Sequence, residues 1–342
     1  RQIQSNSYSE YGAHVDDSTN YQVYNNILEQ ESSTTAVKET YGQLLRTDNG
    51  SLAGTYYYST SCGVGSDANV WKTEAAPGLT YLKAKPLSRT ALAEAVAAAQ
   101  GGGAGEEASG EGISGEAAGG TGNGGSASGE ITGNGGASGE LGESLRDEAA
   151  FAAFISSVNA DDFESGEGWY RWSYQVEALD QEHMLETLQK RYAANSRLVL
   201  TWKDGEYVSE TIDSLGDITD IYIEKRGSGG VADELVIESG AQKIKVISEH
   251  NIRYVLNDGK AQVVRQDGSR VASANLLPSG FFTIETGKEN GNVIGYTLIG
   301  GGFGHGVGMS QNGARAMAVG GYSASEILLY FYENCRIENI YE

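Results

Sequence analysis

The sequence predicts an α+β fold: a single β-rich domain with several short helices, interrupted by a disordered insert. Short segments rich in β-branched and aromatic residues, separated by glycine turns, predict strands and hairpins. They alternate with short segments of helical periodicity. A region of different composition, residues 100–143, consists almost entirely of Gly, Ala, Ser and Glu. The 342 residues, 39% of them hydrophobic, are enough to bury a substantial core around this insert.

The expected elements follow from these patterns in chain order. Before the insert we expect a strand at 55–60, a turn at 61–65 and a helix at 87–100. The elements expected after it are a helix at 144–158, a strand at 169–179, a helix at 183–193, a hairpin at 218–239, a strand at 243–248, a short helix at 249–257, a hairpin at 277–302 and helices at 314–319 and 325–332.

The insert has no aromatic residue, no Lys and no Arg. Such a segment cannot bury enough apolar surface to offset its ordering entropy. Its near-duplicate decapeptides at 121–130 and 131–140 lack aspartate, which argues against a calcium-binding repeat. The chain therefore divides into an N-terminal domain part at 1–99, a flexible insert at 100–143 and a C-terminal domain part at 144–342.

Charge and composition exclude several functions. The net charge of −22 argues against nucleic acid as a binding partner, because proteins bind its phosphates largely through Lys and Arg. No segment reaches the apolar length of a membrane span, and the chain opens RQIQSNSYSEYGAH without a hydrophobic leader. We expect the natural start, and any membrane anchor, upstream of Arg1. Cys62 and Cys335 either pair in one disulfide or are two small buried residues.

One segment, GGGFGHGVGMSQNGA at 300–314, surrounds a histidine with glycines. It matches neither the G-x-S-x-G nucleophile turn nor the G-x-G-x-x-G dinucleotide motif. The four histidines of the chain also lack the i,i+4 spacing of a helical zinc site. Generic hydrolase, dinucleotide and zinc motifs are thus excluded.

The same segment, extended to 301–337, resembles the C-terminal signature of the stage II sporulation protein D family (SpoIID/LytB). The resemblance continues through VDDSTNYQVY (15–24), YYSTSCG (57–63), WYRWSY (169–174), RGSGGVADELVI (226–237) and LPSGFFTI (277–284). It implies an extracytoplasmic protein of the cell wall or forespore septum that acts on peptidoglycan glycan strands during sporulation. The activity implied is a lytic transglycosylase that leaves 1,6-anhydromuramic ends on denuded strands. The alternative is a non-catalytic, wall-binding enhancer of a cell-wall amidase.

Two family features are not matched by the residues present. The family's catalytic glutamate belongs to a segment that would precede Arg1, so we expect this chain to bind glycan without cleaving it. Glu10, Glu74 and Glu164 carry no sequence feature that marks a raised pKa, and the catalytic residue stays unknown. Some relatives bind zinc where this chain has Asp16, Asn20 and Tyr21, a poor zinc ligand set, so we expect no metal and no cofactor.

The candidate substrate-binding residues are Ser59, Ser61, Arg171, His305, Ser310 and Gln311. Glycines at 300–308 allow the backbone to line a groove in which His305, Ser310 and Gln311 bind sugar hydroxyl and N-acetyl groups. The alternative for His305 is a buried histidine that holds two turns together.

Ser59 and Ser61 point to one side of the expected strand and either join the groove or shape a turn. Arg171 either faces a muramic acid carboxylate between sugar-stacking tryptophans or belongs to a core strand. Arg226 is expected to be structural.

Overall fold

The computed structural model describes residues 9–13, 28–101, 137–240, 242–273 and 275–341. It has the predicted mixture of helices and strands, and it divides into two compact units. The larger unit is Tyr56–Glu333, and the smaller one combines Arg1–Thr55 with Asn334–Glu342. In the smaller unit, helix α1 (Glu31–Glu39) precedes strand β1 (Gln43–Thr47), which pairs antiparallel with β14 (Cys335–Asn339).

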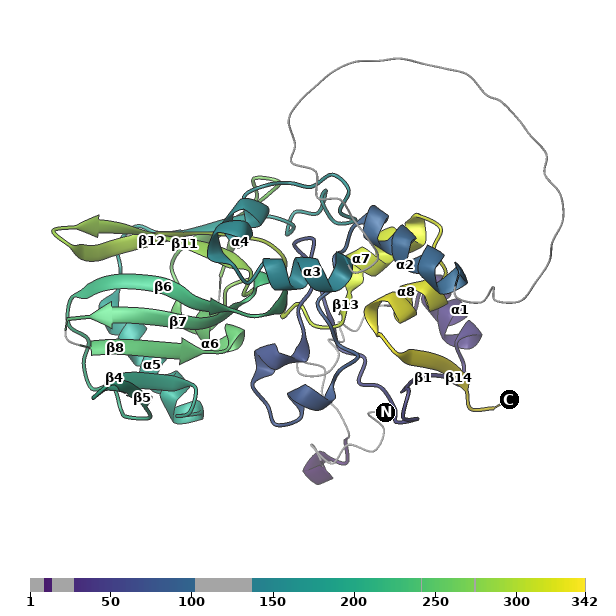
Figure 1. Cartoon of the computed structure of the whole chain (residues 1–342), viewed down its shortest axis with the longest axis horizontal. Coiled ribbons are helices and arrows are strands. Elements are labelled where there is room, and N and C mark those ends of the chain that lie inside the picture. Colours follow the sequence, from purple (N-terminus) through teal and green to yellow (C-terminus); the bar gives the residue numbers. More distant parts are fainter. Residues whose placement is uncertain (1–8, 14–27, 102–136, 241, 274, 342) are drawn as a thin grey trace, which may run out of the picture. The chain divides into compact units, whose positions relative to one another are not determined.

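The larger unit contains two five-stranded antiparallel sheets (Figure 1). The first sheet has the order β10 (Arg270–Ala272), β9 (Gln262–Arg265), β3 (Trp172–Val176), β12 (Asn292–Gly300), β11 (Phe282–Glu289). The second has the order β5 (Glu206–Val208), β4 (Val199–Lys203), β8 (Gln242–Ile247), β7 (Ala232–Ser239), β6 (Ile218–Arg226). The hairpins expected at 218–239 and 277–302 are confirmed as β6–β7 and β11–β12.

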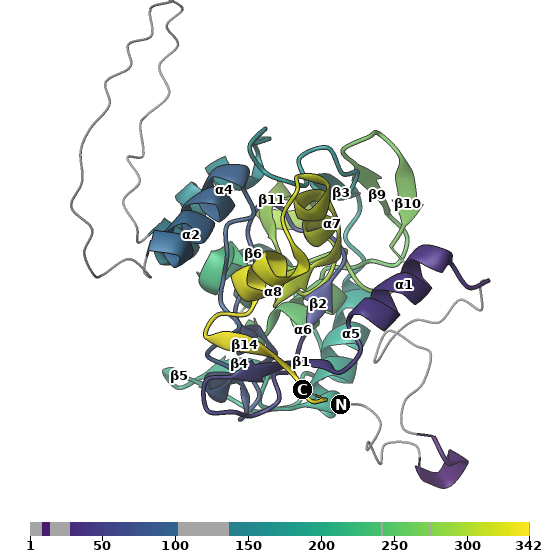
Figure 2. The same cartoon turned by 90° about the vertical axis from the view of Figure 1, so that its right-hand side faces the viewer.

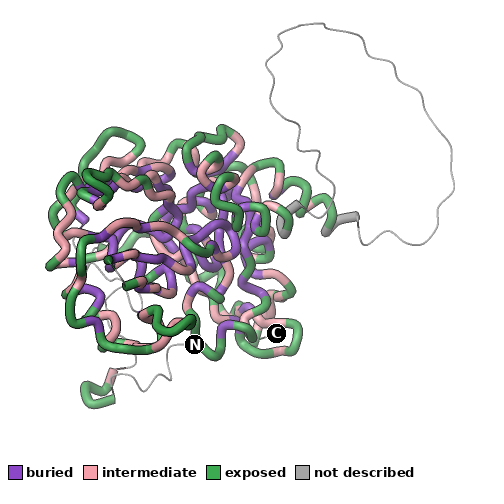
Figure 3. Tube along the Cα trace, turned by 60° about the vertical axis from the view of Figure 1, so that its left-hand side comes forward, coloured by how far each residue is buried: buried purple, intermediate pink, exposed green. Residues whose placement is uncertain are grey.

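One hydrophobic core joins both sheets to the helices α5 (Gln181–Ala194) and α6 (Glu249–Val255). Tyr174 of β3, Leu188 of α5 and Ile237 of β7 are fully buried in it. Buried stretches run through the interior of the trace, and exposed stretches lie mainly on its periphery (Figure 3). The alternation of buried and exposed side chains along β3 is the period-two pattern that the sequence analysis used.

Outside the sheets, two short strands bring distant segments together. Strand β2 (Tyr57–Tyr58) pairs in parallel with β13 (Met309–Ser310), and helices α7 (Gln311–Val319) and α8 (Ala324–Phe331) follow β13 directly. Figure 2 shows α8 beside helix α2 (Arg89–Gly101). The strand expected at 55–60 is therefore present but short, and the two C-terminal helices are confirmed.

The start of the C-terminal part differs from the prediction. The helix expected at 144–158 is present but shorter, as α4 (Glu148–Ile155), and Asp147 rather than Ser144 caps it. An additional helix, α3 (Ala137–Ser144), precedes it. Helix α3 includes the last seven residues of the predicted insert and packs on the turn Ser228–Gly230. That contact supplies the stability which its glycine-rich composition lacks. The repeats expected in the insert lie almost wholly outside the described residues.

Candidate functional site

The glycine-rich loop between β12 and β13 packs closely against the segment that follows β2. Thr60 pairs with Phe303, and Ser66 pairs with Val307. Gly308 has φ +76°, and a Cβ at this position would lie 2.1 Å from the Tyr56 carbonyl oxygen. Only glycine fits there. The density of glycines therefore allows two backbone segments to lie in contact.

Glu164 lies beneath these two segments and is 1% exposed. Its Oε2 accepts a hydrogen bond from the Ser61 hydroxyl at 2.7 Å, and its Oε1 accepts one from the Ser310 hydroxyl at 2.7 Å. The Ser61 backbone N–H donates a third, at 3.0 Å to Oε1. Burial raises the pKa of Glu164 to about 7, although the hydrogen bonds from Ser61 and Ser310 lower it.

Both serines are buried and fully occupied by protein partners. The Ser61 hydroxyl accepts from the Gly63 N–H at 3.1 Å, and the Ser310 hydroxyl accepts from the Gly313 N–H at 3.3 Å, as the N-cap of α7. This differs from the expectation that Ser61 and Ser310 face a ligand. No sequence feature marks the raised pKa of Glu164, because its environment is built by residues far away in sequence.

His305 is half-buried in the glycine-rich loop. Its Nδ1 accepts a hydrogen bond from the Val307 N–H at 3.0 Å. The ring lies 5.9 Å from the Tyr58 ring and 5.6 Å from the Trp71 ring, measured between centroids. Burial first, and then the charge of Arg253, lower the pKa of His305 to about 4, against a hydrogen bond with the Tyr57 backbone. The imidazole is therefore neutral at pH 7 and holds the loop in place.

Arg171 is also occupied by the protein. Its guanidinium makes five hydrogen bonds, to the carbonyl oxygens of Cys62, Phe154, Ser157 and Tyr170 and to the Tyr170 hydroxyl. It holds the chain around β3 together and has no donor left for a muramic acid carboxylate. Arg226 is buried and ion-paired with Glu148 at 2.6 Å, which is the structural role expected for it.

Of the remaining candidates, Ser59 neighbours Thr60, and Gln311 is the first residue of α7, beside Asn312 in the chain. We group these two with three further residues as the aromatic–amide surface: Trp169, Phe303, Ser59, Gln311 and Asn312. Phe303 is 41% exposed, and its ring lies 4.7 Å from the Trp169 ring between centroids. Gln311 is exposed, and Ser59 and Asn312 are half-buried. The Ser59 and Thr60 hydroxyl oxygens are 3.2 Å apart, and the Asn312 Nδ2 donates to Thr60 at 2.9 Å. Thr60, which pairs with Phe303, thus joins the polar and aromatic halves of this surface.

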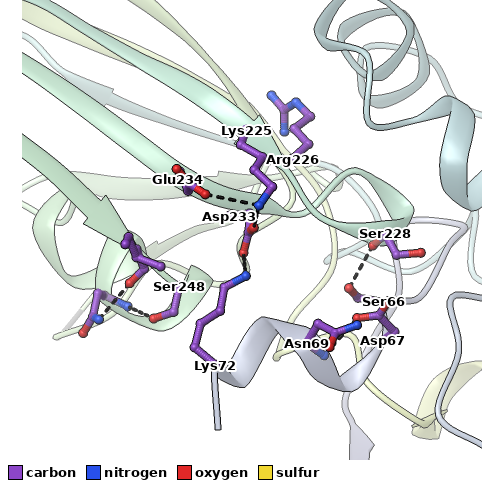
Figure 4. Close-up of polar contacts among 12 residues, drawn as sticks. Ser66, Asp67, Asn69, Lys72, Lys225, Arg226, Ser228, Asp233, Glu234 and Ser248 are labelled. Carbon is purple, nitrogen blue, oxygen red and sulfur yellow. Dashed lines mark hydrogen bonds and ion pairs between the residues drawn. The ribbon is translucent and has the colours of Figure 1, made fainter. Parts of the chain in front are cut away.

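A second network involves Ser66, which contacts both the glycine-rich loop and the β6–β7 hairpin. Figure 4 shows its contact with Ser228 of the hairpin turn. The Ser66 N–H donates to the Gly306 carbonyl at 2.7 Å, and the Ser66 hydroxyl donates to the Ser228 carbonyl at 2.8 Å. Nearby, the buried Asp233 forms ion pairs with Lys72 and, at 3.4 Å, with Lys225. The loop is thereby fixed to a rigid part of the core.

Three further expectations concern metal, cysteines and membrane. Asp16, Asn20 and Tyr21 lie outside the described residues. Within the described ranges, no group of three or more His, Cys, Asp or Glu side chains is arranged to hold a metal ion. Cys62 is a buried free thiol and Cys335 a half-buried one. None of the helices in the described part of the chain is long and apolar enough to cross a membrane.

Comparison with known families gives one match. A profile described as "Domain of unknown function (DUF8618)" matches residues 137–308, just over half of the chain. The chain belongs to this family. The DUF8618 region begins at α3, ends immediately before β13 and includes Glu164, Trp169 and Phe303. The serines that bind Glu164 lie outside it, on both sides. A comparison with curated proteins found no match.

Proposed function

We propose that this chain binds the glycan strands of peptidoglycan and acts outside the cytoplasm in remodelling of the cell wall. The observation that carries the proposal is the aromatic–amide surface. Three segments that resemble the stage II sporulation protein D family, 57–63, 169–174 and 301–314, contribute to it. The first and third are held together by the hydrogen bonds of Glu164 and by the pairing of Thr60 with Phe303. The second is joined to the third by the Gly302 N–H, which donates to the Trp169 carbonyl at 2.8 Å.

The chemistry of this surface suits an uncharged, N-acetylated sugar. A pyranose ring has apolar C–H faces that pack on aromatic rings, and Phe303 is exposed for such a contact while Trp169 supports it from one side. Amide and hydroxyl groups both donate and accept hydrogen bonds, so Gln311, Asn312 and Ser59 match sugar hydroxyl and N-acetyl groups. A wall-binding protein that recruits or stimulates an amidase needs nothing more.

Cleavage as a lytic transglycosylase is the second candidate, and the pKa of Glu164 favours it. A carboxyl group with a pKa of about 7 is suited to general acid–base catalysis near neutral pH. Its burial, however, keeps it from touching a glycosidic oxygen in this conformation. Glu164 is therefore assigned as a positioning residue for Ser61 and Ser310. A transglycosylase would need its proton donor from another residue.

Binding is tested with purified denuded glycan strands in a sedimentation or calorimetric assay. Phe303→Ala should lower the affinity roughly three- to tenfold, because it removes the stacking face without changing a buried contact. The matched control is Trp202→Ala on β4, which removes an aromatic side chain of similar exposure, 45%, from another surface. Equal affinity of wild type and Phe303→Ala would reject this surface as the glycan site.

Cleavage is tested by mass spectrometry of the same strands after long incubation. If the chain only binds glycan, no 1,6-anhydro ends appear. If anhydro ends appear and Glu164→Gln abolishes them while binding persists, Glu164 is the proton donor and the positioning role is wrong.

A further inference from the structure

A pocket of about 340 Å³ lies between α5 and α6, away from the residues of the aromatic–amide surface. Its lining residues are His183, Thr187, Lys190, Arg191, Tyr254, Asn257, Gly259 and Asn275. The four from α5 follow the i, i+4, i+7, i+8 spacing that puts side chains on one helix face. The volume is at the lower end for ligand sites and suits a molecule about as large as one sugar.

Arg191 gives this pocket an unusual charge for a chain with a net charge of −22. Its Nε donates to the Asn251 Oδ1 at 2.7 Å, and its guanidinium carbon lies 4.9 Å from the centroid of the Tyr254 ring. Among the described residues, Arg191 forms no ion pair and its two terminal nitrogens have no hydrogen-bond partner. The hydrogen bond of Nε therefore orients the guanidinium, while its two terminal nitrogens remain available to donate to a ligand.

Among the described residues, none of the acidic side chains around the pocket forms an ion pair with Arg191. Lys190 pairs with Glu186 at 3.3 Å, but both side chains are exposed, so the pair is weak. The carboxylate of Asp258 accepts the N–H groups of Lys260 and Ala261 instead of a cation in the pocket.

Burial, followed by the charges of Arg191 and Arg253, lowers the pKa of His250 to about 4.

We propose that this pocket binds a small anionic ligand, a carboxylate or phosphate group carried on a polar, sugar-sized body. The open fork of Arg191 accommodates two oxygens of the anion, and Lys190 adds charge from the rim. The Tyr254 hydroxyl and the Asn275 amide line the pocket and are positioned to bind the body of the ligand. This site is separate from glycan binding, and its test does not depend on that function.

The test is calorimetric titration of the full chain at low salt with three probes: glucose 6-phosphate, glucuronate and glucose. We expect the two anions to bind at least tenfold more tightly than glucose, which equals about 1.4 kcal/mol. Arg191→Gln should remove the difference between charged and neutral probes. Arg191→Lys should retain charge but lose the two-point contact, with the greater loss for the phosphate. Comparing the two anions shows which group the site prefers.

Arg197→Gln is the matched control, because Arg197 is an exposed arginine just beyond the end of α5. Melting temperatures check that each variant is folded, and Lys190→Gln serves as a second test if Arg191→Gln unfolds. The proposal is overturned if glucose binds as tightly as the anions. It is equally overturned if Arg197→Gln weakens binding as much as Arg191→Gln, or if neither anion binds at millimolar concentration.

Discussion

Two buried glutamates, Glu164 and Glu249, stabilise their regions by different physical means. Glu249, at the start of α6, is 2% exposed and forms an ion pair with Arg253 at 3.0 Å. Glu164, beneath the glycine-rich loop, is equally buried but accepts its hydrogen bonds from two serine hydroxyls and one backbone N–H. Burial raises the pKa of both carboxyl groups. Only Glu249 has a cation that directly opposes this shift.

The difference shows that burial alone does not determine how a carboxyl group responds to pH or mutation. Around Glu249 the opposite charge of Arg253 is held by the carbonyl oxygens of Leu277 and Pro278, at 2.9 and 3.1 Å. Removing either charge leaves the other uncompensated in the core. Around Glu164 the hydrogen-bond donors are neutral. Glu164 can therefore gain or lose a proton without leaving a buried cation unpaired. The glycine-rich loop is thus the more pH-sensitive of the two regions.

The largest expected effect is that of Arg253→Met. It leaves Glu249 without a counter-charge and two carbonyl groups without a donor, and should lower the free energy of unfolding by about 3–5 kcal/mol. Urea denaturation at pH 7 measures the loss. The double variant Glu249→Leu with Arg253→Met should recover a large part of it. A double variant no more stable than Arg253→Met would show that the pair acts through more than its charges.

A smaller effect is expected for Glu164→Gln. The amide keeps the size of the side chain and one acceptor oxygen, but replaces the O–H group that the carboxyl carries below its pKa of about 7 with an NH2 group, which has one more hydrogen to pair and no acceptor capacity. We expect a loss of about 1–3 kcal/mol at pH 5, measured by urea denaturation. Glu164→Ala, which removes every acceptor from three buried donors, should cost more. If Glu164→Ala were as stable as the wild type, water would have to replace the carboxyl group as hydrogen-bond acceptor without loss of stability.

The sequence predicted most of the larger unit because its signals are local. Alternation and glycine turns identified both hairpins, and helical spacing identified α2, α5, α7 and α8. The prediction was wrong at α3, whose Gly- and Ser-rich residues are helical only because they pack on the turn at Ser228–Gly230. Such tertiary contacts cannot be predicted from the composition of a segment.

The site was harder to predict because its residues are far apart along the chain. Ser61 and Ser310 were chosen correctly as neighbours in one cluster, but as ligand contacts rather than as partners of Glu164. Nothing in the sequence around Glu164 distinguishes it from an exposed glutamate. Burial raises its pKa, and the hydroxyl donors that oppose this shift are 103 and 146 residues away. The tilted ring contact between the exposed Phe303 and Trp169 likewise depends on a loop geometry that no local pattern encodes.

The last expected effect tests the contrast between the two glutamates through pH. The folded pKa of Glu164, about 7, exceeds its ordinary value of 4.5, so between these values the folded state holds a proton that the unfolded state has lost. The stabilisation is complete below pH 4.5 and disappears as the pH rises to 7, at about 1.4 kcal/mol per pH unit. The stability difference between wild type and Glu164→Gln isolates this term, because the other titrations cancel. This stability difference should therefore fall between pH 5 and 7 in urea denaturation series.

Ser310→Ala removes a hydrogen bond that lowers the pKa of Glu164 and should extend the fall in stability to higher pH. A difference that stays constant from pH 5 to 8 would mean that the three donors keep Glu164 ionised throughout, and that the glycine-rich loop is no more sensitive to pH than α6.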